Sequence, residues 1–294
     1  MRGGVACEVE EEATREDDLL SSVACREELQ HCRARHPHLN DALARLQTTL
    51  QQGLCRELQT TDERRLLQIT LFGLAHQAAD DFFDLVLLAT HGYGIGAQKM
   101  LRPLYERVVS ALYLIEHPEE VQDFNDYADI DAWHVLTNAK RVGVDPVSVM
   151  GQEKYDQLEK AYKAAEARFT RSGSRRARPS WAQKDLAQRA AEVKVVGAGG
   201  QTVALDKLYG ACGFWPTMLL HTTNVSLEAR LTPTATGGRA FIHEPTRVEA
   251  DIALKCAHDL IALLFHKCNE FFSWDLDVSQ LAQDVLRCWG TGTR

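Results

Sequence analysis

Apolar residues recur every three or four positions along most of this chain, which is the period of an amphipathic helix. One clear example is the run formed by Leu43, Leu46, Leu50 and Leu54. The same period predicts helices over residues 62–91, 98–116, 119–141, 147–169, 182–195, 205–231, 247–272 and 276–289. The pattern contains no series of alternating strands separated by regular turns. We therefore expect an all-α fold, a multi-helix bundle with long loops on one side.

Breaks in this pattern divide the chain into four segments. The first segment is acidic and lacks apolar periodicity, so it is expected to be a flexible tail. A short block of helical spacing follows it, then a long block, then a shorter stretch at the C-terminus. The expected division is an acidic flexible tail over 1–15, N-terminal helices over 16–60, a main helical bundle domain over 61–275 and a C-terminal helical appendage over 276–294.

Two polar segments interrupt the main bundle. Residues 170–180 (TRSGSRRARPS) form an arginine-rich loop, and residues 232–246 are rich in threonine, glycine and proline. Within the second segment, GGRAFIHEP has the composition of a short hairpin. Pro216 is expected to interrupt the helix over 205–231.

The composition indicates a globular protein with a sizeable core. The chain has 294 residues, of which 45% are apolar and 25% are charged, an ordinary balance for one or two domains. Its net charge of −8 argues against a surface dedicated to coating nucleic acid, while a local basic groove stays open.

The eight cysteines and the N-terminal sequence bear on the compartment. No two cysteines form a CxxC pair, so the clustered soft ligands of a structural zinc site are not expected. The acidic N-terminal segment has no apolar run behind it, so no signal peptide is expected, and no apolar run has the length of a membrane span. These features predict a cytoplasmic protein with free thiols, no cofactor and no membrane partner.

The segment QKMLRPLYERVVSALYLIE, residues 98–116, carries the most informative pattern. At about 100° per residue, the apolar residues from Leu101 to Ile115 form one stripe. A second stripe lies beside it and contains Arg102, Glu106, Val109 and Tyr113. A charged stripe that flanks a core stripe lies at the rim of a bundle, where a pocket can open. The simpler alternative is a structural ion pair between Arg102 and Glu106, which are four residues apart.

Three segments occur in an order that resembles a known family. They are the helix RPLYERVVSALYL with its Arg-x-x-x-Glu spacing, the loop ending in PSW ahead of a short polar helix, and Tyr209 followed by His221 in LYGACGFWPTMLLH. This order resembles the prokaryotic domain of unknown function 5677 family over roughly residues 60–270. That family has no established reaction, so the resemblance mainly implies a helical fold.

The resemblance implies polar family positions at Arg102, Glu106, Trp181, Tyr209 and His221. Two departures bear on their local geometry. Pro103 lies inside the Arg-Glu motif, and Gly213 to Thr217 stand where small hydroxyl residues are expected before His221. The family is also distantly similar to HEPN helical domains, many of which serve toxin–antitoxin and phage-defence systems, an analogy at the level of fold.

These positions define a candidate site for an anion. Arg102 is expected to clamp the anion and Glu106 to orient Arg102. His221 is the candidate catalytic residue, expected to donate a hydrogen bond or a proton. The remaining members of the ligand-binding set, of which the last two would form walls of the pocket, are Tyr113, Trp181 and Tyr209.

A metal site is an alternative at His76, Asp80, Asp84 and His91, which fall within a sector of about 80° on one helix. Such mixtures of histidine and carboxylate bind borderline metals, but di-metal sites in bundles draw ligands from several helices. A solvated or inter-helix polar face is the simpler interpretation, so no metal is expected.

The most basic stretch of the chain is a candidate nucleic-acid contact. Its arginines lie in and beside the loop over 170–180 and are Arg168, Arg171, Arg175, Arg176 and Arg178. Guanidinium groups bind the phosphates of RNA or DNA. The simpler alternative is a solvated connection between helices.

A ribonuclease alternative follows from the HEPN analogy. The HEPN signature has an arginine four to six residues before a histidine, which handles the proton of the RNA 2′-hydroxyl. Arg26 with His31 and Arg33 with His38 fit this spacing, but outside the stretch that resembles the family. No arginine stands at that distance before His221.

The sequence favours a binding or regulatory protein of prokaryotic defence or stress systems, with a polar pocket for an anionic ligand such as a nucleotide or RNA. It leans against an enzyme, and the enzymatic alternative is a HEPN-like, metal-independent ribonuclease. A third alternative is a structural or protein-interaction module without a small-molecule site. The helix over 247–272 is apolar around much of its circumference, so it is either central or part of a homodimer interface.

Overall fold

The computed structural model describes residues 23–170, 177–196, 202–221, 223–241 and 247–290. The expected tail over 1–15 lies outside these residues. Within the described ranges most of the chain is helical, and the strands form two small two-stranded sheets. The predicted all-α multi-helix bundle is therefore confirmed. None of the helices in this part of the chain combines the length and the apolar character of a membrane span.

The helices differ in length and in place. Those that form the body of the molecule are α2 (Val23–Arg35), α3 (Leu39–Leu54), α4 (Arg65–Thr90), α5 (Gly94–Glu116), α12 (Ala250–Phe272) and α13 (Ser279–Trp289). Those that follow α5 along the chain are η1 (Pro118–Glu120), α6 (Val121–Arg141), α7 (Pro146–Met150), α8 (Gln152–Phe169) and α9 (Leu186–Glu192). The remaining elements are β1 (Lys194–Val196), β2 (Thr202–Ala204), η2 (Leu205–Leu208), η3 (Tyr209–Phe214), α10 (Trp215–Leu220), α11 (Asn224–Glu228), β3 (Leu231–Pro233) and β4 (Arg239–Phe241).

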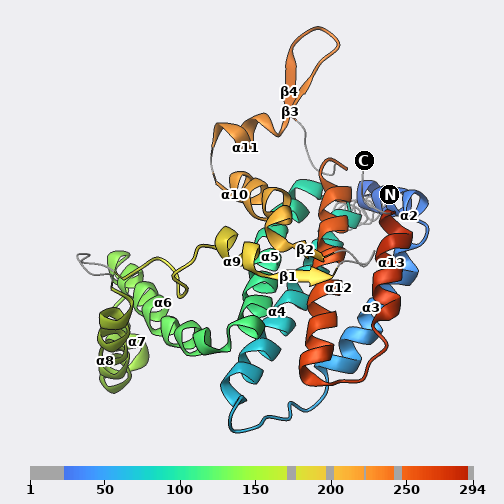
Figure 1. Ribbon diagram of the computed structural model, residues 1–294. Coiled ribbons are helices and arrows are strands. Elements are labelled where there is room, and N and C mark those ends of the chain that lie inside the picture. Colours follow the sequence, from blue (N-terminus) through green and yellow to red (C-terminus); the bar gives the residue numbers. More distant parts are fainter. Residues whose placement is uncertain (1–22, 171–176, 197–201, 222, 242–246, 291–294) are drawn as a thin grey trace, which may run out of the picture.

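α5 is the central helix of the body. It packs along α4 and α12, and the three helices lie side by side in Figure 1. The apolar stripe predicted on this segment forms the core, with Leu101, Leu104 and Val108 completely buried. Each such side chain stabilises the fold by about 1.5–3 kcal/mol. α12 buries residues along its whole length, so it is a central helix. The homodimer interface that was the alternative for this helix stays a prediction.

Gly94 allows the start of α5 to approach the chain that precedes α12. A Cβ atom on Gly94 would lie only 2.0 Å from the carbonyl oxygen of Val248, a distance that no side chain tolerates. The preceding turn needs a second glycine, because Gly92 has a φ of 85°, in the left-handed region that glycine enters without steric cost. These two positions fix how α4, α5 and α12 meet.

The terminal helices complete the body. α3 packs against α13, and both contact α12. Arg45 of α3 donates two hydrogen bonds to Asp284 of α13, from Nε over 2.7 Å and from Nη2 over 2.6 Å. The helices predicted near the two ends of the sequence are therefore held together by a bidentate ion pair.

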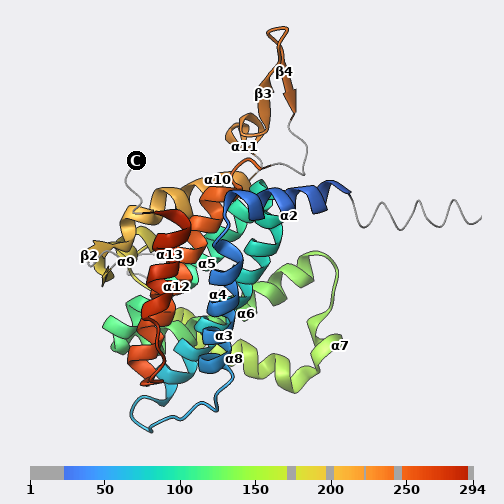
Figure 2. The same ribbon diagram turned by 90° about the vertical axis from the view of Figure 1, so that its right-hand side faces the viewer.

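α6, α7 and α8 form an arm beside the body (Figure 1). Within the arm, α6 packs along α8, and the rings of Trp133 and Tyr162 stack with centroids 5.0 Å apart. Asn125 of α6 donates a hydrogen bond of 2.9 Å to Thr70 of α4, which ties the arm to the body. The hairpin of β3 and β4 also stands away from the body, as both views show (Figures 1 and 2).

The helix predicted over 205–231, with an interruption at Pro216, is divided into more pieces in the structure. This segment contains η2, the π-helical η3, α10 and α11, and β3 begins at Leu231. Pro216 lies in the first turn of α10, where its missing N–H has no helical partner to lose. Thr223 starts α11 with a side-chain cap that accepts from Ser226 N over 3.2 Å. Local capping and proline chemistry therefore overrode the apolar period.

Two further boundaries differ from the predicted helices. Gly151 adopts a φ of 86° and separates α7 from α8, where one helix over 147–169 was predicted. The helix predicted over 182–195 is shorter, because α9 ends at Glu192 and the chain then forms β1. A hairpin is present, but β3 lies before the predicted segment GGRAFIHEP, residues 237–245, and only β4 lies within it, with Leu231 paired to Phe241. Residues 242–245 of the predicted segment lie outside the described residues.

Candidate functional site

The candidate site lies along one face of α5. Arg102, Glu106, Ser110 and Tyr113 follow one another at intervals of three or four residues, so they share a face of the helix. Arg102 Nη1 lies 3.5 Å from Glu106 Oε2, and about half of the Glu106 side chain is exposed (49%). Ser110 and Tyr113 are buried. Pro103 lies within α5, and the helix continues past it.

Tyr113 is held at the buried end of this face. Its hydroxyl donates to Glu120 Oε1 over 2.7 Å and accepts from Lys184 Nζ over 3.5 Å. Burial and the hydrogen bond to Glu120 raise the pKa of Tyr113 to about 12. The phenol therefore stays protonated at neutral pH and acts as a donor.

Trp181 covers Tyr113 from the loop that precedes α9. The two rings lie 6.1 Å apart, and the ring of Phe124 meets Trp181 edge-on at 5.2 Å. The guanidinium carbon of Arg189 lies 4.7 Å from the centroid of the Trp181 ring, a cation–π contact. Trp181 is thus a packed side chain with 9% of its surface exposed.

Arg189 is the most unusual residue of the site. It lies on α9, a helix that Asp185 and Gln188 start with a reciprocal capping box. Arg189 is only 2% exposed. Its Nη1 donates to Ser110 Oγ over 2.9 Å, but its Nε is buried and has no hydrogen-bond partner among the described residues. A guanidinium group has five N–H donors, and the buried Nε–H of Arg189 is one that lacks an acceptor.

The electrostatic surroundings of Arg189 connect it to the face of α5. Burial lowers the pKa of Arg189, while the nearby charges of Glu106 and Glu120 oppose that shift and Arg102 adds to it. Among the described residues no carboxylate forms an ion pair with Arg189. The guanidinium is therefore a buried positive charge that carboxylates only partly compensate.

Arg102 also has a buried N–H donor without an acceptor. Its Nη1 atom is buried and makes no hydrogen bond with the described residues, since 3.5 Å to Glu106 is long for a well-formed bond. Two arginines on neighbouring helices, Arg102 and Arg189, thus have buried N–H groups that lack acceptors. Such donors suit the oxygen atoms of a carboxylate or a phosphate.

Tyr209 lies beside this group, on η3. Its ring is 6.4 Å from the ring of Tyr105 of α5, and Tyr105 donates to the Leu205 carbonyl over 2.8 Å. A Cβ on Gly213 would come within 2.8 Å of the Tyr209 ring, so glycine at this position permits the packing. Tyr209 is half-buried and packs on Tyr105, the residue that precedes Glu106 in the sequence.

His221 is the predicted site residue that no described contact joins to the others. It is exposed and follows the last residue of α10. Its backbone N–H donates to Thr217 and its carbonyl accepts from Thr223. No hydrogen bond, ion pair or ring contact of its imidazole is found within the described residues. Its role as a proton donor therefore stays a prediction.

The alternative metal ligands do not gather into a metal site. Across the part of the chain that the structure describes, no three histidine, cysteine or acidic side chains are placed to hold a metal ion. His76 packs against Phe72, with ring centroids 4.7 Å apart, and His91 Nδ1 lies 2.8 Å from the Leu87 carbonyl oxygen. The two acidic residues Asp80 and Asp84 are exposed. His76 and His91, by contrast, are of intermediate exposure.

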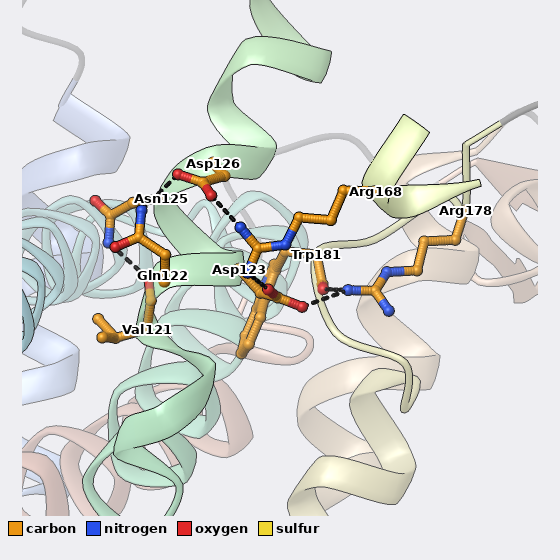
Figure 3. A network of polar contacts seen from close by, with 8 residues as sticks. All are labelled: Val121, Gln122, Asp123, Asn125, Asp126, Arg168, Arg178 and Trp181. Atoms are coloured by element: carbon orange, nitrogen blue, oxygen red, sulfur yellow. Dashed lines mark hydrogen bonds and ion pairs between the residues drawn. The ribbon is translucent and has the colours of Figure 1, made fainter. Parts of the chain in front are cut away.

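Arg178 is a structural residue of the arm (Figure 3). Its Nη2 lies 2.9 Å from Asp123 Oδ2 and donates to the Trp181 carbonyl, and only 8% of the side chain is exposed. Asp123 also accepts from Arg168. The Nη2 of Arg178 is therefore occupied, while its buried Nε has no hydrogen-bond partner among the described residues. The other arginines of the predicted nucleic-acid contact, Arg171, Arg175 and Arg176, lie outside the described residues.

Sequence reasoning missed three residues of this group: Ser110, Lys184 and Arg189. Ser110 is a polar residue in the apolar run VVSALY, four positions after Glu106, and that spacing is a usable signal. Arg189 lies in LAQRAAE, where it reads as an ordinary surface arginine. Only the packing of α9 on α5 reveals that it is buried.

The fold and this site together define a class of protein: a helical bundle with an arginine-containing polar cluster on its central helix. The model of the Family of unknown function (DUF5677) matches residues 68–231, more than half of the chain. The chain therefore belongs to this family, as its three motifs predicted. No curated protein and no solved structure matches it, and the likeness to HEPN domains is not shown.

Proposed function

We propose that this protein binds a small anion through Arg102 and Arg189, and that this binding serves a regulatory role. The observation that carries the proposal is the burial of Arg189 without an ion-pair partner in the described residues. Burying a guanidinium group is unfavourable unless acceptors replace the lost water. An oxyanion between the two arginines would supply those acceptors.

The surroundings of Arg189 favour a small anion over a nucleic acid. Trp181 is covered by Arg189, Phe124 and Tyr113, so its ring is not free to stack on a base. Arg178 is already paired with Asp123. Stacking platforms and open basic grooves are the usual means of binding single-stranded RNA. The chemistry that fits best is the oxyanion of a phosphate or a carboxylate.

The wider role rests on the family resemblance. In this proposal the bound anion acts as a signal, as it does in a regulatory protein. The cysteine pattern and the acidic N-terminal sequence favour the cytoplasm, and the resemblance favours a prokaryotic defence or stress system. The ribonuclease alternative would instead require His221 to act on RNA.

A thermal-shift titration tests the proposal. Inorganic phosphate, sulfate, acetate, a nucleoside monophosphate and a short RNA are added in turn to the wild type and to Arg102→Ala. A ligand at about a hundred times its Kd adds about 2.7 kcal/mol to stability, a rise in Tm of roughly 5 °C for a chain of this size. We expect this rise with a phosphate or carboxylate anion in the wild type and its loss in Arg102→Ala.

A matched control separates binding from surface charge. Arg239 on the hairpin pairs with Glu228 in solvent, so Arg239→Ala removes the same charge far from α9 and should keep the full ligand-induced rise. The proposal is wrong if no small anion raises the Tm of the wild type. A rise with RNA alone, lost in His221→Ala, would support the ribonuclease alternative instead.

A further inference from the structure

The outer face of α4 carries a regular repeat of its own. Its positions are separated alternately by four and three residues, which is the heptad spacing of helices that pack along each other. They are Ile69, Gly73, His76, Asp80, Phe83 and Leu87. The large apolar members Ile69, Phe83 and Leu87 are 47%, 36% and 59% exposed. α4 therefore buries one face in the bundle and presents a second packing face to solvent.

We infer that this face binds the same face of a second copy of the chain, with the two α4 helices antiparallel. The inference goes beyond the proposed anion binding and does not depend on it, because none of the six residues belongs to the arginine site. It also moves the predicted homodimer interface from α12, which lies in the core, to a helix with an exposed heptad face.

Two polar residues specify the direction of the second helix. Antiparallel helices aligned about Ala78, the midpoint of the repeat, place His76 of each copy opposite Asp80 of the other. An imidazole N–H then donates to a carboxylate, and the two-fold axis repeats the contact. In a parallel pair the same positions of both helices would meet, so Asp80 would face a second Asp80, and like charges disfavour that arrangement. Polar residues within an apolar seam commonly fix the register of paired helices in this way.

The apolar positions are complementary in the same register. Phe83 of each copy lies opposite Gly73 of the other, and Ile69 lies opposite Leu87. A Cβ atom on Gly73 would have no heavy atom within 4 Å, so the surface of α4 has open space at this residue. The aromatic ring of the second copy fills that space, as a knob enters a hole in a coiled coil. Charge and shape therefore select one register.

This interface also accounts for two residues of the predicted metal set. Within the described part of the chain, neither His76 nor Asp80 makes a hydrogen bond or an ion pair, and His76 has an edge-on ring contact with Phe72. A donor and an acceptor four residues apart on one helix face suit the matching pair of an antiparallel copy better than a metal ion, which needs ligands from several helices.

Sedimentation of the full-length protein tests the interface. We expect the wild type to have twice the 32.9 kDa mass of one chain. Leu87→Glu changes an exposed side chain and sets a carboxylate against Ile69 of the second copy, so it should give a monomer with an unchanged circular dichroism spectrum. The matched control is Val149→Glu on α7, where the valine is 73% exposed and outside the repeat. This control should stay dimeric.

A pair of charge variants tests the register. His76→Glu sets acidic positions against each other and Asp80→Lys sets basic positions against each other, so each variant alone should be monomeric. Mixed in equal amounts, the two variants bring acidic positions opposite basic ones and should form a heterodimer.

The inference is wrong if the wild type is monomeric at about 100 μM, a concentration at which even a weak interface associates, or if Leu87→Glu stays dimeric. Charge variants that stay dimeric alone, or a mixture of them that stays monomeric, would overturn the antiparallel register. The result for the wild type does not depend on whether any variant folds.

Discussion

At the scale of single residues, Arg189 presents a conflict between stability and binding. Its guanidinium is buried, makes a hydrogen bond to Ser110 and a contact with Trp181, and lacks an ion-pair partner in the described residues. Replacing a poorly compensated buried charge by an apolar side chain of similar length is frequently neutral or stabilising, by about 1–4 kcal/mol. Residues kept in spite of such a penalty are commonly functional.

We therefore expect Arg189→Met to be at least as stable as the wild type and unable to bind the anion. Urea denaturation measures the first property, and the anion-induced shift in Tm measures the second. If Arg189 is only architectural, the variant should instead lose roughly 1–3 kcal/mol, the range for a lost hydrogen-bond partner in the core. A variant that is less stable and still binds the anion would contradict the site.

His258 and Asp259, neighbours on α12, respond to pH in opposite directions. Burial lowers the pKa of His258 to about 4, against an opposing effect of Asp284. Burial raises the pKa of Asp259 to about 6, opposed by Lys255. Between pH 6.5 and 4 the unfolded chain protonates His258 while the folded chain does not, so stability falls as pH falls. Between about pH 4 and 6 the folded chain holds the Asp259 proton more tightly, so stability falls as pH rises.

Single substitutions should separate these opposing effects. His258 is 1% exposed, and its pKa shift corresponds to about 3 kcal/mol lost on acidification from pH 6.5 to 4. We expect Asp259→Asn to lose more stability on acidification than the wild type. His258→Gln, which retains an acceptor for the indole N–H of Trp289, should lose less. Urea midpoints measured from pH 7 to pH 4 decide this, and superimposable profiles would contradict it.

At the scale of elements, one ion pair connects the two ends of the chain. Asp284 is almost completely buried, with 1% of its side chain exposed, whereas 40% of the Arg45 side chain is exposed. Removing Arg45 would leave a buried carboxylate without its main partner. Because solvent screens the Arg45 side of the pair, we expect Arg45→Ala to lower the free energy of unfolding by roughly 1–3 kcal/mol.

The control for this prediction is an ion pair in open solvent. Lys163 and Glu159 are four residues apart on α8, with 65% and 38% of their side chains exposed, so Lys163→Ala should change stability by at most about 0.5 kcal/mol. Denaturant titrations of the two variants give both values. Equal effects would mean that the contact between α3 and α13 contributes no more than a surface pair.

The sequence predicted the long helices correctly and the short elements poorly. The long helices α4, α5 and α12 have an apolar period over many turns, and the period alone identifies them. The segment from Leu205 to Leu231 has a similar composition, but Pro216 and the cap at Thr223 cut it into short pieces. A period measured over a window of residues cannot detect a single hydrogen bond that ends a helix.

At the scale of the whole molecule, the sequence predicted only the part of the site whose residues lie on one helix, α5. Arg102, Glu106 and Tyr113 are readable because helical spacing fixes their common face. Arg189 lies 87 positions after Arg102 in the sequence but packs on the same face of α5. The spacing of residues along the chain cannot predict a contact between segments so far apart. For the same reason the pairing of Arg178 with Asp123 could not be predicted.

The fold of the whole chain depends on helices that lie outside the family match. The match ends at residue 231, yet α12 packs along both α4 and α5, and α13 covers α12 with Leu281 and Val285 buried. A division of the chain at residue 275 would therefore cut through one continuous core. We propose that the terminal helices and the main bundle unfold as a single cooperative unit.

Deleting residues 276–294 tests this unit. The deletion exposes the surface that Leu281 and Val285 cover, at about 1.5–3 kcal/mol each, and removes the buried partner of Arg45. It also takes away Trp289, whose indole N–H donates to His258 over 3.1 Å. We expect one unfolding transition in the intact chain and, in the truncated chain, a Tm lower by roughly 10 °C or no folded state. Calorimetry measures the number of unfolding transitions, and circular dichroism measures the Tm of the truncated chain. An unchanged Tm would show that the core is stable without residues 276–294, and the C-terminal segment would then be a separate appendage.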